Sequence, residues 1–281
     1  MNTLGVVIPC YRQERFLPRT LAALAALPPD WHTDDVVVLA SAPAAGWAAP
    51  PAPWRVVSPA GQARRMPLKP GVARMAGLAA CAGEWVLFVD ADVEMNREWL
   101  ELALSRARAS GPESRLAGLW GRIEEWFVDA GGERPGNADL YRLGSGERRV
   151  DYLATFALYR RAALIEAGGY DPRLSSEEDF ELGLRLRARG WELRTLDAVA
   201  ARHWSGPRPS FAELTRRWST GLCFGQGEVL RLYAGRPGFA VLFRRQGHYV
   251  AMLALWVLGA ASLVLALVRN DAAPLLGWLA R

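Results

Sequence analysis

The first two hundred residues alternate short apolar runs with segments of helical periodicity, which limits the chain to few folds. The runs that predict strands are Leu4–Ile8, Asp35–Leu39, Trp54–Val57 and Trp85–Val89. The segments with helical spacing between them are Phe16–Leu27, Val72–Cys81 and Arg97–Ala109. Strands that alternate with helices favour a sheet covered on both faces. We therefore expect an α/β fold with a mixed, mostly parallel sheet.

Near the C-terminus, Tyr249–Val268 is a stretch of twenty residues without a charge. Twenty helical residues span about 30 Å, the thickness of the hydrocarbon core of a bilayer. Arg244 and Arg245 precede the stretch and only Arg269 closely follows it. The positive-inside rule then places the N-terminal domain in the cytoplasm, at the cell inner (cytoplasmic) membrane. The alternative is a buried core helix, which usually has a polar face.

Basic residues concentrate just before this predicted transmembrane helix. The net charge of the chain is +5, and residues 202–248 hold eight arginines but only two glutamates. We expect residues 206–248 to form a basic amphipathic segment near the membrane, with Phe211–Tyr233 as one helix. The tail, residues 269–281, is too short to span a bilayer. It can lie at the interface, re-enter the membrane or be the remnant of a second helix.

The cysteines exclude two classes of small domain. Cys10, Cys81 and Cys223 lie far apart and are odd in number. They form neither a disulfide framework nor a Cys-x-x-Cys zinc site, which favours a reducing compartment.

The fourth predicted strand ends in Asp90 and Asp92, separated by Ala91. Ligands of open α/β sheets bind beyond the carboxyl ends of the strands. Two carboxylates there can share a hard cation such as Mg²⁺ or Mn²⁺, whose shell is completed by substrate phosphates. The alternative is that Asp92 caps the helix that begins near Asn96.

A second acidic cluster opens the predicted helix 180–188. Its members are Glu177, Glu178, Asp179 and Glu181. Acidic residues are favoured at a helix N-terminus, and one of them can also be held as a proton acceptor. Capping and solvated charge account for Glu177 and Glu181. They account less well for Asp179, which leads an apolar ladder.

Four segments in order resemble family-2 glycosyltransferases of the GT-A fold, over most of residues 4–220. They are VVIPCYRQERFL, KPGVARMAGLAACAGEWVLFVDADV, DYLATFALYRRAALIEAGGYDPRL and SEEDFELGLRLRARGWEL. The third resembles the acceptor-side segment that ends in Gly-Gly-Phe-Asp. The resemblance identifies residues 1–205 as the glycosyltransferase domain, followed by the segment 206–248, a transmembrane helix at 249–268 and the tail 269–281.

The resemblance implies a nucleotide-sugar site. Its residues would be Pro9, Tyr11, Glu14, Ser41, Arg74, Asp90, Ala91 and Asp92. Arg74 would lie beside the diphosphate, Asp90 would face ribose or metal, and Asp92 would bind the metal. The second strand ends in Ala40-Ser41, where the family usually has acidic residues that read the base. Ser41 or backbone groups would take over that recognition.

The resemblance also implies the chemistry. Asp179 would be the general base, supported by Glu178, and direct attack by the acceptor would invert the anomeric configuration. The metal, Mg²⁺ or Mn²⁺, would neutralise the leaving diphosphate. His203 follows the predicted strand Trp191–Ala200 and is a candidate third metal ligand; the alternative is a histidine buried by Trp204 or bonded to a loop.

Arg216-Arg217-Trp218 resembles the Gln-x-x-Arg-Trp motif of processive members, with Leu214 in place of the glutamine. Two interpretations remain: a basic helix face against anionic lipid, or binding of the diphosphate by Arg217.

These features predict a membrane-anchored inverting glycosyltransferase. It would move a sugar from a nucleotide-diphosphate donor to a hydroxyl or phosphate acceptor, lipid-linked or part of a cell-envelope glycan. The alternative is a catalytically inactive membrane-anchored scaffold or sugar-nucleotide-binding protein. A nucleotidyltransferase or a dehydrogenase would need a glycine-rich motif after the first strand, and this chain has none there. No nucleic-acid motif accompanies the basic cluster, so nucleic acid is not an expected partner.

Overall fold

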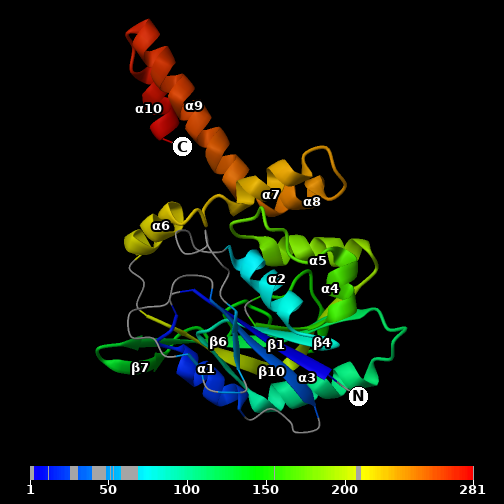
Figure 1. The fold of residues 1–281 in the computed structure, drawn as a ribbon. Coiled ribbons are helices and arrows are strands. Elements are labelled where there is room, and N and C mark those ends of the chain that lie inside the picture. Colours follow the sequence, from blue (N-terminus) through cyan, green and yellow to red (C-terminus); the bar gives the residue numbers. More distant parts are fainter. Residues whose placement is uncertain are drawn as a thin grey trace. The chain divides into compact units, whose positions relative to one another are not determined.

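The computed structural model describes residues 3–11, 13–25, 31–39, 49–50, 52, 54–57, 69–154, 156–206 and 210–280, with only the backbone of 32–39 and 210. The chain divides into two compact units, residues 1–225 and 226–281. Figure 1 shows the elements of both.

Within the described residues, ten strands of the first unit form one sheet, in the order β3-β2-β1-β4-β9-β6-β10-β5, with β7 on β6 and β8 on β10. The strands are β1 (Thr3–Cys10), β2 (His32–Leu39), β3 (Arg55–Val57), β4 (Trp85–Val89), β5 (Val93–Met95), β6 (Leu116–Asp129), β7 (Gly132–Pro135), β8 (Arg148–Arg149), β9 (Phe156–Arg160) and β10 (Glu192–Ser205). Neighbouring strands among β3, β2, β1 and β4 pair in parallel, as do β6 and β10. β9 and β5 pair with their neighbours antiparallel. The predicted mixed α/β fold is confirmed.

Helices cover both faces of this sheet (Figure 1). α1 (Leu17–Leu24) and α3 (Arg97–Ala109) lie on one face; α2 (Pro70–Ala80), α4 (Arg161–Ala167) and α5 (Glu178–Ala188) lie on the other. Side chains of a strand alternate between faces, so each central strand supplies both cores. In β4, Leu87 belongs to the core under α1 and α3, and Phe88 to the core under α2, α4 and α5. Burial on both faces explains the continuous apolar runs of the sequence.

Several boundaries differ from the predicted ones because pairing extends the strands. β1 continues through Pro9 to Cys10, in parallel register with β2. β10 runs five residues beyond the predicted end at Ala200 because it pairs with β6 up to Ser205. His203 therefore lies inside a strand rather than after it. β7 forms a hairpin with β6, and Gly132, its first residue, has a φ of +103°.

The predicted amphipathic helix 211–233 is two helices, α6 (Ser210–Ser219) and α7 (Gly225–Tyr233). Between them Gly221 has a φ of +79°, a left-handed conformation that ends a helix. The prediction of a single helix over 211–233 is therefore wrong, because the chain leaves the helical conformation at Gly221.

The second unit contains most of α7 and a long apolar helix. Its other helices are α8 (Phe239–Arg245), α9 (Gly247–Arg269) and α10 (Ala273–Leu279). Among the described residues, α9 is the one helix long and apolar enough to cross a membrane, with a mean hydropathy of 2.5. The buried residues of α9 are Gly259 and Ala266, whereas a core helix has most of its residues buried.

The tail after α9 folds back along that helix. The Trp278 indole donates a hydrogen bond to the Leu255 carbonyl oxygen at 2.9 Å. A Cβ at Gly259 would lie 2.6 Å from the Trp278 ring, so a glycine is required opposite the indole. Residues 273–279 are therefore a short antiparallel partner of α9.

Candidate active site

The carboxyl ends of β1 and β4 lie side by side and hold the first group of predicted site residues. β1 and β4 pair in parallel, so the segments that follow them leave the sheet at the same edge. There the Gln13 side-chain amide donates a hydrogen bond to Asp92 Oδ2. Sequence analysis missed Gln13 as a site residue. Its position between Tyr11 and Glu14, after β1, was the available signal.

Three hydrogen bonds to backbone carbonyl oxygens fix the turn at residues 90–92. Val93 N donates to the Asp90 carbonyl oxygen at 3.0 Å. The Thr20 hydroxyl donates to the Ala91 carbonyl oxygen at 2.9 Å, and Trp204 N donates to that of Asp92 at 2.8 Å. Ala91 is fully buried, which leaves only its backbone for any ligand contact.

Asp92 does not cap the helix that follows. Asn96 is the N-cap of α3, and its Oδ1 accepts a hydrogen bond from Glu98 N at 2.9 Å. The capping alternative for Asp92 is therefore wrong, because a closer side chain already satisfies the helix N-terminus.

Asp92 and His203 form a pair suited to a divalent cation. Asp92 is buried, and its Oδ1 has no hydrogen-bond partner among the described residues. His203 Nε2 lies 3.4 Å from Asp92 Oδ2. Within the described ranges, no three His, Cys, Asp or Glu side chains form a group that could hold a metal. Asp92 and His203 could therefore hold a cation only in an open site, where water and further oxygen ligands would complete the coordination shell.

Arg74 of α2 joins the two acidic clusters that the sequence separates. Its guanidinium is buried and lies 3.1 Å from Asp90 Oδ1, 2.8 Å from Glu178 Oε1 and 3.4 Å from Asp179 Oδ1. A planar guanidinium with five donors suits such a shared position. One cation thus faces three carboxylates from two elements.

Burial, together with neighbouring carboxylates, raises the pKa of two of these carboxyls. Burial raises the pKa of Asp90 to about 6; Arg74 opposes this and Asp92 adds to it. Burial likewise raises the pKa of Asp179 to about 8, with Arg74 opposing and Glu178 adding. A carboxyl that binds a proton near neutral pH is suited to general acid–base chemistry.

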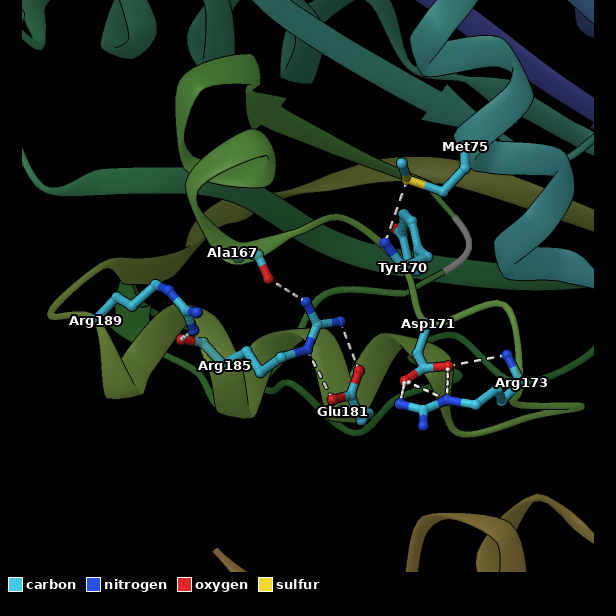
Figure 2. Close-up of polar contacts among 8 residues, drawn as sticks. All are labelled: Met75, Ala167, Tyr170, Asp171, Arg173, Glu181, Arg185 and Arg189. Carbon is cyan, nitrogen blue, oxygen red and sulfur yellow. Dashed lines mark hydrogen bonds and ion pairs between the residues drawn. The ribbon is translucent and has the colours of Figure 1, made fainter. Parts of the chain in front are cut away.

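The acidic residues at the start of α5 differ in what they contact. Glu177 is the N-cap with a φ of +66°, and Glu178 and Asp179 are in the first turn. Glu181, one turn on, is buried in a two-pronged ion pair with Arg185 at 2.6 and 2.7 Å. Arg185 also donates to the Ala167 carbonyl oxygen, which ties α5 to α4 (Figure 2). The expectation that Glu181 is a solvated charge is therefore wrong.

The remaining predicted residues have varied surroundings. Tyr11 and Glu14 are half-buried in the segment after β1, and Pro9 is buried within that strand. Their predicted roles stay predictions. Ser41 lies outside the described residues. On α6, Arg216 is paired with Glu213 at 2.6 and 2.8 Å.

Tyr170 is a second residue that sequence analysis missed. Its side chain is buried, and the centroid of its ring lies 5.4 Å from the guanidinium carbon of Arg74. Its backbone N–H donates to Met75 Sδ at 3.3 Å, next to Arg74 in α2 (Figure 2). The available signal was that Tyr170 stands where the Gly-Gly-Phe-Asp segment of the resembled family has its phenylalanine.

Residues 63–168 match the family model described as glycosyl transferase family 2. Two relatives from Mycobacterium tuberculosis, strains CDC 1551 / Oshkosh and ATCC 25618 / H37Rv, are named pre-mycofactocin glycosyltransferase. Each is 34% identical over 137 residues, covering 44% of this chain and 28% of the relative. The chain thus matches less than a third of the length of these relatives.

Solved structures show the same fold. S. aureus TarS 1–349 in complex with UDP-GlcNAc has a TM-score of 0.53 at 19% identity, covering 75% of this chain and 60% of that one. GalNAc-T7 with UDP, GalNAc and Mn²⁺ has a TM-score of 0.53 at 16% identity, covering 73% and 44%. At these identities the likeness establishes the GT-A-type fold alone.

Proposed function

We propose that this chain transfers a sugar from a nucleotide-diphosphate donor to an acceptor hydroxyl or phosphate, because residues 63–168 match the glycosyl transferase family 2 model. The observation that carries this proposal is the contact of Arg74 with Asp90 on one side and with Glu178 and Asp179 on the other. The Arg74 guanidinium thus holds Asp90, on the proposed nucleotide side, close to Asp179, the proposed proton acceptor. A direct transfer with a single base needs the donor and the base in such fixed positions.

Asp179 is the base of the proposed reaction. Its carboxyl accepts the proton of the acceptor hydroxyl as that oxygen attacks the anomeric carbon, and a single displacement inverts the configuration. Glu178 lies deeper and shares Arg74 Nη1 with Asp179. Arg74 acts as a positioning residue, since its nitrogens are engaged with carboxylates.

Asp92 and His203 would hold Mg²⁺ or Mn²⁺, with Asp90 nearby. The metal, when bound, neutralises charge on the leaving diphosphate. Gln13 orients the Asp92 carboxylate through their hydrogen bond. The TarS and GalNAc-T7 structures contain UDP or a UDP-sugar, so uridine donors are the first to test.

We further propose that the domain works at the cytoplasmic membrane, with the catalytic unit in the cytoplasm and a lipid-linked or cell-envelope acceptor. α9 supplies an anchor. α6 supports surface contact, because Phe211, Leu214 and Trp218 share one face and are 82%, 57% and 64% exposed. Arg217 on the same helix favours anionic lipid.

The second candidate function is an inactive, sugar-nucleotide-binding scaffold. The sequence that follows β2, Ala40-Ser41, has no acidic residue where the resembled family usually has one, which favours this candidate. Binding of UDP, GDP, CDP and dTDP to the full chain in detergent, with and without Mn²⁺, tests both candidates by calorimetry. We expect tight, metal-dependent binding of one diphosphate that Asp92→Ala abolishes. Donor binding without transfer to any acceptor would favour the scaffold, and no binding by folded protein would contradict both candidates.

A further inference from the structure

The loop that leads into α5, residues 171–177, is held by the turn between α6 and α7, residues 220–224. The Ser176 hydroxyl donates a hydrogen bond to the Leu222 carbonyl oxygen at 2.9 Å, across 46 positions of the chain. Gly225, the buried first residue of α7, lies against Ser176. All three residues belong to the first compact unit. We call this meeting of Ser176, Leu222 and Gly225 the loop contact.

Gly225 has no room for a side chain. A Cβ at this position would lie 2.6 Å from the Ser176 carbonyl oxygen and 2.8 Å from its carbonyl carbon. Both are backbone atoms, so no rotation of a side chain relieves the overlap, and an alanine would push the loop and the turn apart. Gly227, two residues on in α7, has no described atom within 4 Å of its Cβ position. The close approach therefore requires a glycine at 225 but not at 227.

The turn that meets the loop is itself a fixed structure. Phe224 N donates to the Gly221 carbonyl oxygen at 3.0 Å. The Phe224 ring also packs against that of Trp218, the last aromatic residue of α6, with 5.2 Å between the centroids. The turn is thus tied to α6, and Leu222 presents its carbonyl oxygen from a defined position.

The other end of the loop is attached to α2. Lys69, the N-cap of α2, donates a hydrogen bond from its ammonium group to the Arg173 carbonyl oxygen. The Arg173 guanidinium in turn donates to the Asp171 carboxylate at 2.6 Å (Figure 2). The loop is therefore held near its start by α2 and at Ser176 by the turn after α6.

The residue between this loop and α5 has a strained backbone. Glu177 has a φ of +66°, in the left-handed region that residues with a Cβ seldom adopt. Such a conformation persists where its surroundings determine it. Both neighbours of Glu177 are fixed, Ser176 by the loop contact and Glu178 by its ion pair with Arg74 at 2.8 Å. Asp179 follows directly, so these two anchors set the direction in which the chain presents its carboxyl.

We propose that Ser176 and Gly225 are positioning residues for Asp179. The turn after α6 holds Ser176, which keeps Glu177 in its left-handed conformation and so places the first turn of α5. The inference rests on the proposed function, in which Asp179 takes a proton from the acceptor. A displacement of about 1 Å of a reacting group can lower a rate about 10²-fold, so a contact outside the site can control the reaction.

The donor side of the site has other supports. Asp92 accepts a hydrogen bond from the Gln13 side chain, and its carbonyl oxygen accepts one from Trp204 N at 2.8 Å. The Thr20 hydroxyl holds the Ala91 carbonyl oxygen at 2.9 Å. These partners come from β10, α1 and the segment after β1, and none of them lies in α5 or in the loop before it. Loss of the loop contact should therefore affect the reaction rate and spare donor binding.

The test compares the full chain in detergent with two variants of the contact, Ser176→Ala and Gly225→Ala, and with their double variant. Gly227→Ala is the control for Gly225→Ala, because it adds the same methyl group to α7 in open space. Ser219→Ala is the control for Ser176→Ala. The Ser219 hydroxyl also donates to a carbonyl oxygen, that of Arg216 at 3.0 Å, but within α6.

Two measurements are made on each variant. Hydrogen exchange of the peptide 174–182 includes the Glu181 amide, which donates to the Glu177 carbonyl oxygen at 3.0 Å and reports the first turn of α5. This measurement needs no substrate. Hydrolysis of UDP-GlcNAc with Mn²⁺, followed as release of UDP, replaces the acceptor by water. The water O–H breaks, its proton passes to Asp179, its oxygen bonds to the anomeric carbon and UDP leaves.

We expect Ser176→Ala and Gly225→Ala each to speed exchange in this peptide about fivefold or more, the effect of one lost hydrogen bond. Each should lower the hydrolysis rate about tenfold or more. The affinity for UDP should change by less than about twofold, as for an independent site. The double variant should resemble the more affected single variant, because both substitutions remove the same contact. Gly227→Ala and Ser219→Ala should match the wild type.

Equal exchange in Gly225→Ala and Gly227→Ala would show that the turn does not hold α5 and would overturn the inference. Faster exchange with an unchanged hydrolysis rate would also overturn it, since the contact would then be structural only. Ser176→Ala adds no atoms and decides the matter if Gly225→Ala does not fold. Failure of the proposed function looks different: Asp179→Asn would hydrolyse the donor at the wild-type rate, while the exchange difference between Gly225→Ala and Gly227→Ala would still be seen.

Discussion

Arg74 and Glu178, which are 104 residues apart in the chain, form a buried ion pair with 2.8 Å between Nη1 and Oε1. The pair connects α2 to the first turn of α5. Because Arg74 also contacts Asp90 and Asp179, loss of one guanidinium leaves several carboxylates without a counter-charge.

Arg74→Ala should lower the free energy of unfolding by about 3–5 kcal/mol, the cost of leaving a buried charge unpaired. Urea denaturation at pH 7 measures this. Arg97→Ala is the control, since its pair with Glu101 is exposed and should contribute only about 0.3–0.5 kcal/mol. Similar losses for the two variants would contradict the central position of Arg74.

Asp179→Asn should lower kcat by about 10²–10⁴-fold and leave donor affinity nearly unchanged, because a general base acts on the chemical step. In the wild type, kcat should rise with pH up to about pH 8, as Asp179 loses its proton. Steady-state rates across pH, measured by release of the nucleoside diphosphate, test both expectations. An acid limb that persists in Asp179→Asn would assign it to another group.

Asp92→Ala and His203→Ala should each weaken Mn²⁺ binding, measured by calorimetry with the nucleoside diphosphate present. Binding should also weaken as pH falls below about 6, because a protonated Asp90 adds no negative charge near the metal. Glu94→Ala is the control, because this β5 side chain accepts from the Trp204 indole at 2.9 Å. Unchanged Mn²⁺ affinity in Asp92→Ala would remove this residue from the metal site.

Glu181→Gln should destabilise the fold by about 1–3 kcal/mol without changing donor affinity, since Glu181 anchors Arg185 rather than a ligand. Thermal and urea unfolding, together with nucleotide titration, separate the two effects. Glu101→Gln, in an exposed pair, is the matched control. A selective loss of donor binding in Glu181→Gln would return this residue to the site.

The apolar face of α6 should contact anionic lipid. In nanodiscs of phosphatidylglycerol, α6 amides of the full chain should exchange hydrogen more slowly than in phosphatidylcholine. Phe211→Ser with Trp218→Ser should abolish the difference, since the buried apolar area is lost. Ile165→Ser removes an equally exposed apolar residue from α4 and should have no effect. Equal exchange in both lipids would contradict the lipid contact.

Local sequence patterns predicted elements better than boundaries. The strand Trp85–Val89 and the helix Arg97–Ala109 have the predicted bounds, because their apolar periods and end signals are local. β10 ran longer than predicted because its last residues are held by pairing with β6. Such pairing joins residues distant in sequence, and no local pattern reports it.

The sequence by itself determined the α/β class, the apolar helix near the C-terminus and the positions of the two acidic clusters, since each depends on residues close together in the chain. Only the tertiary structure decided what these acids contact. It brought Arg74 to Asp90 and Asp179, placed His203 beside Asp92, and paired Glu181 with Arg185 inside the protein. The physical reason is that a carboxylate becomes buried and meets a counter-charge only when folding packs α2, β4, α5 and β10 together. The charge state of a carboxyl therefore depends on the fold, whereas its place in a motif depends on the sequence.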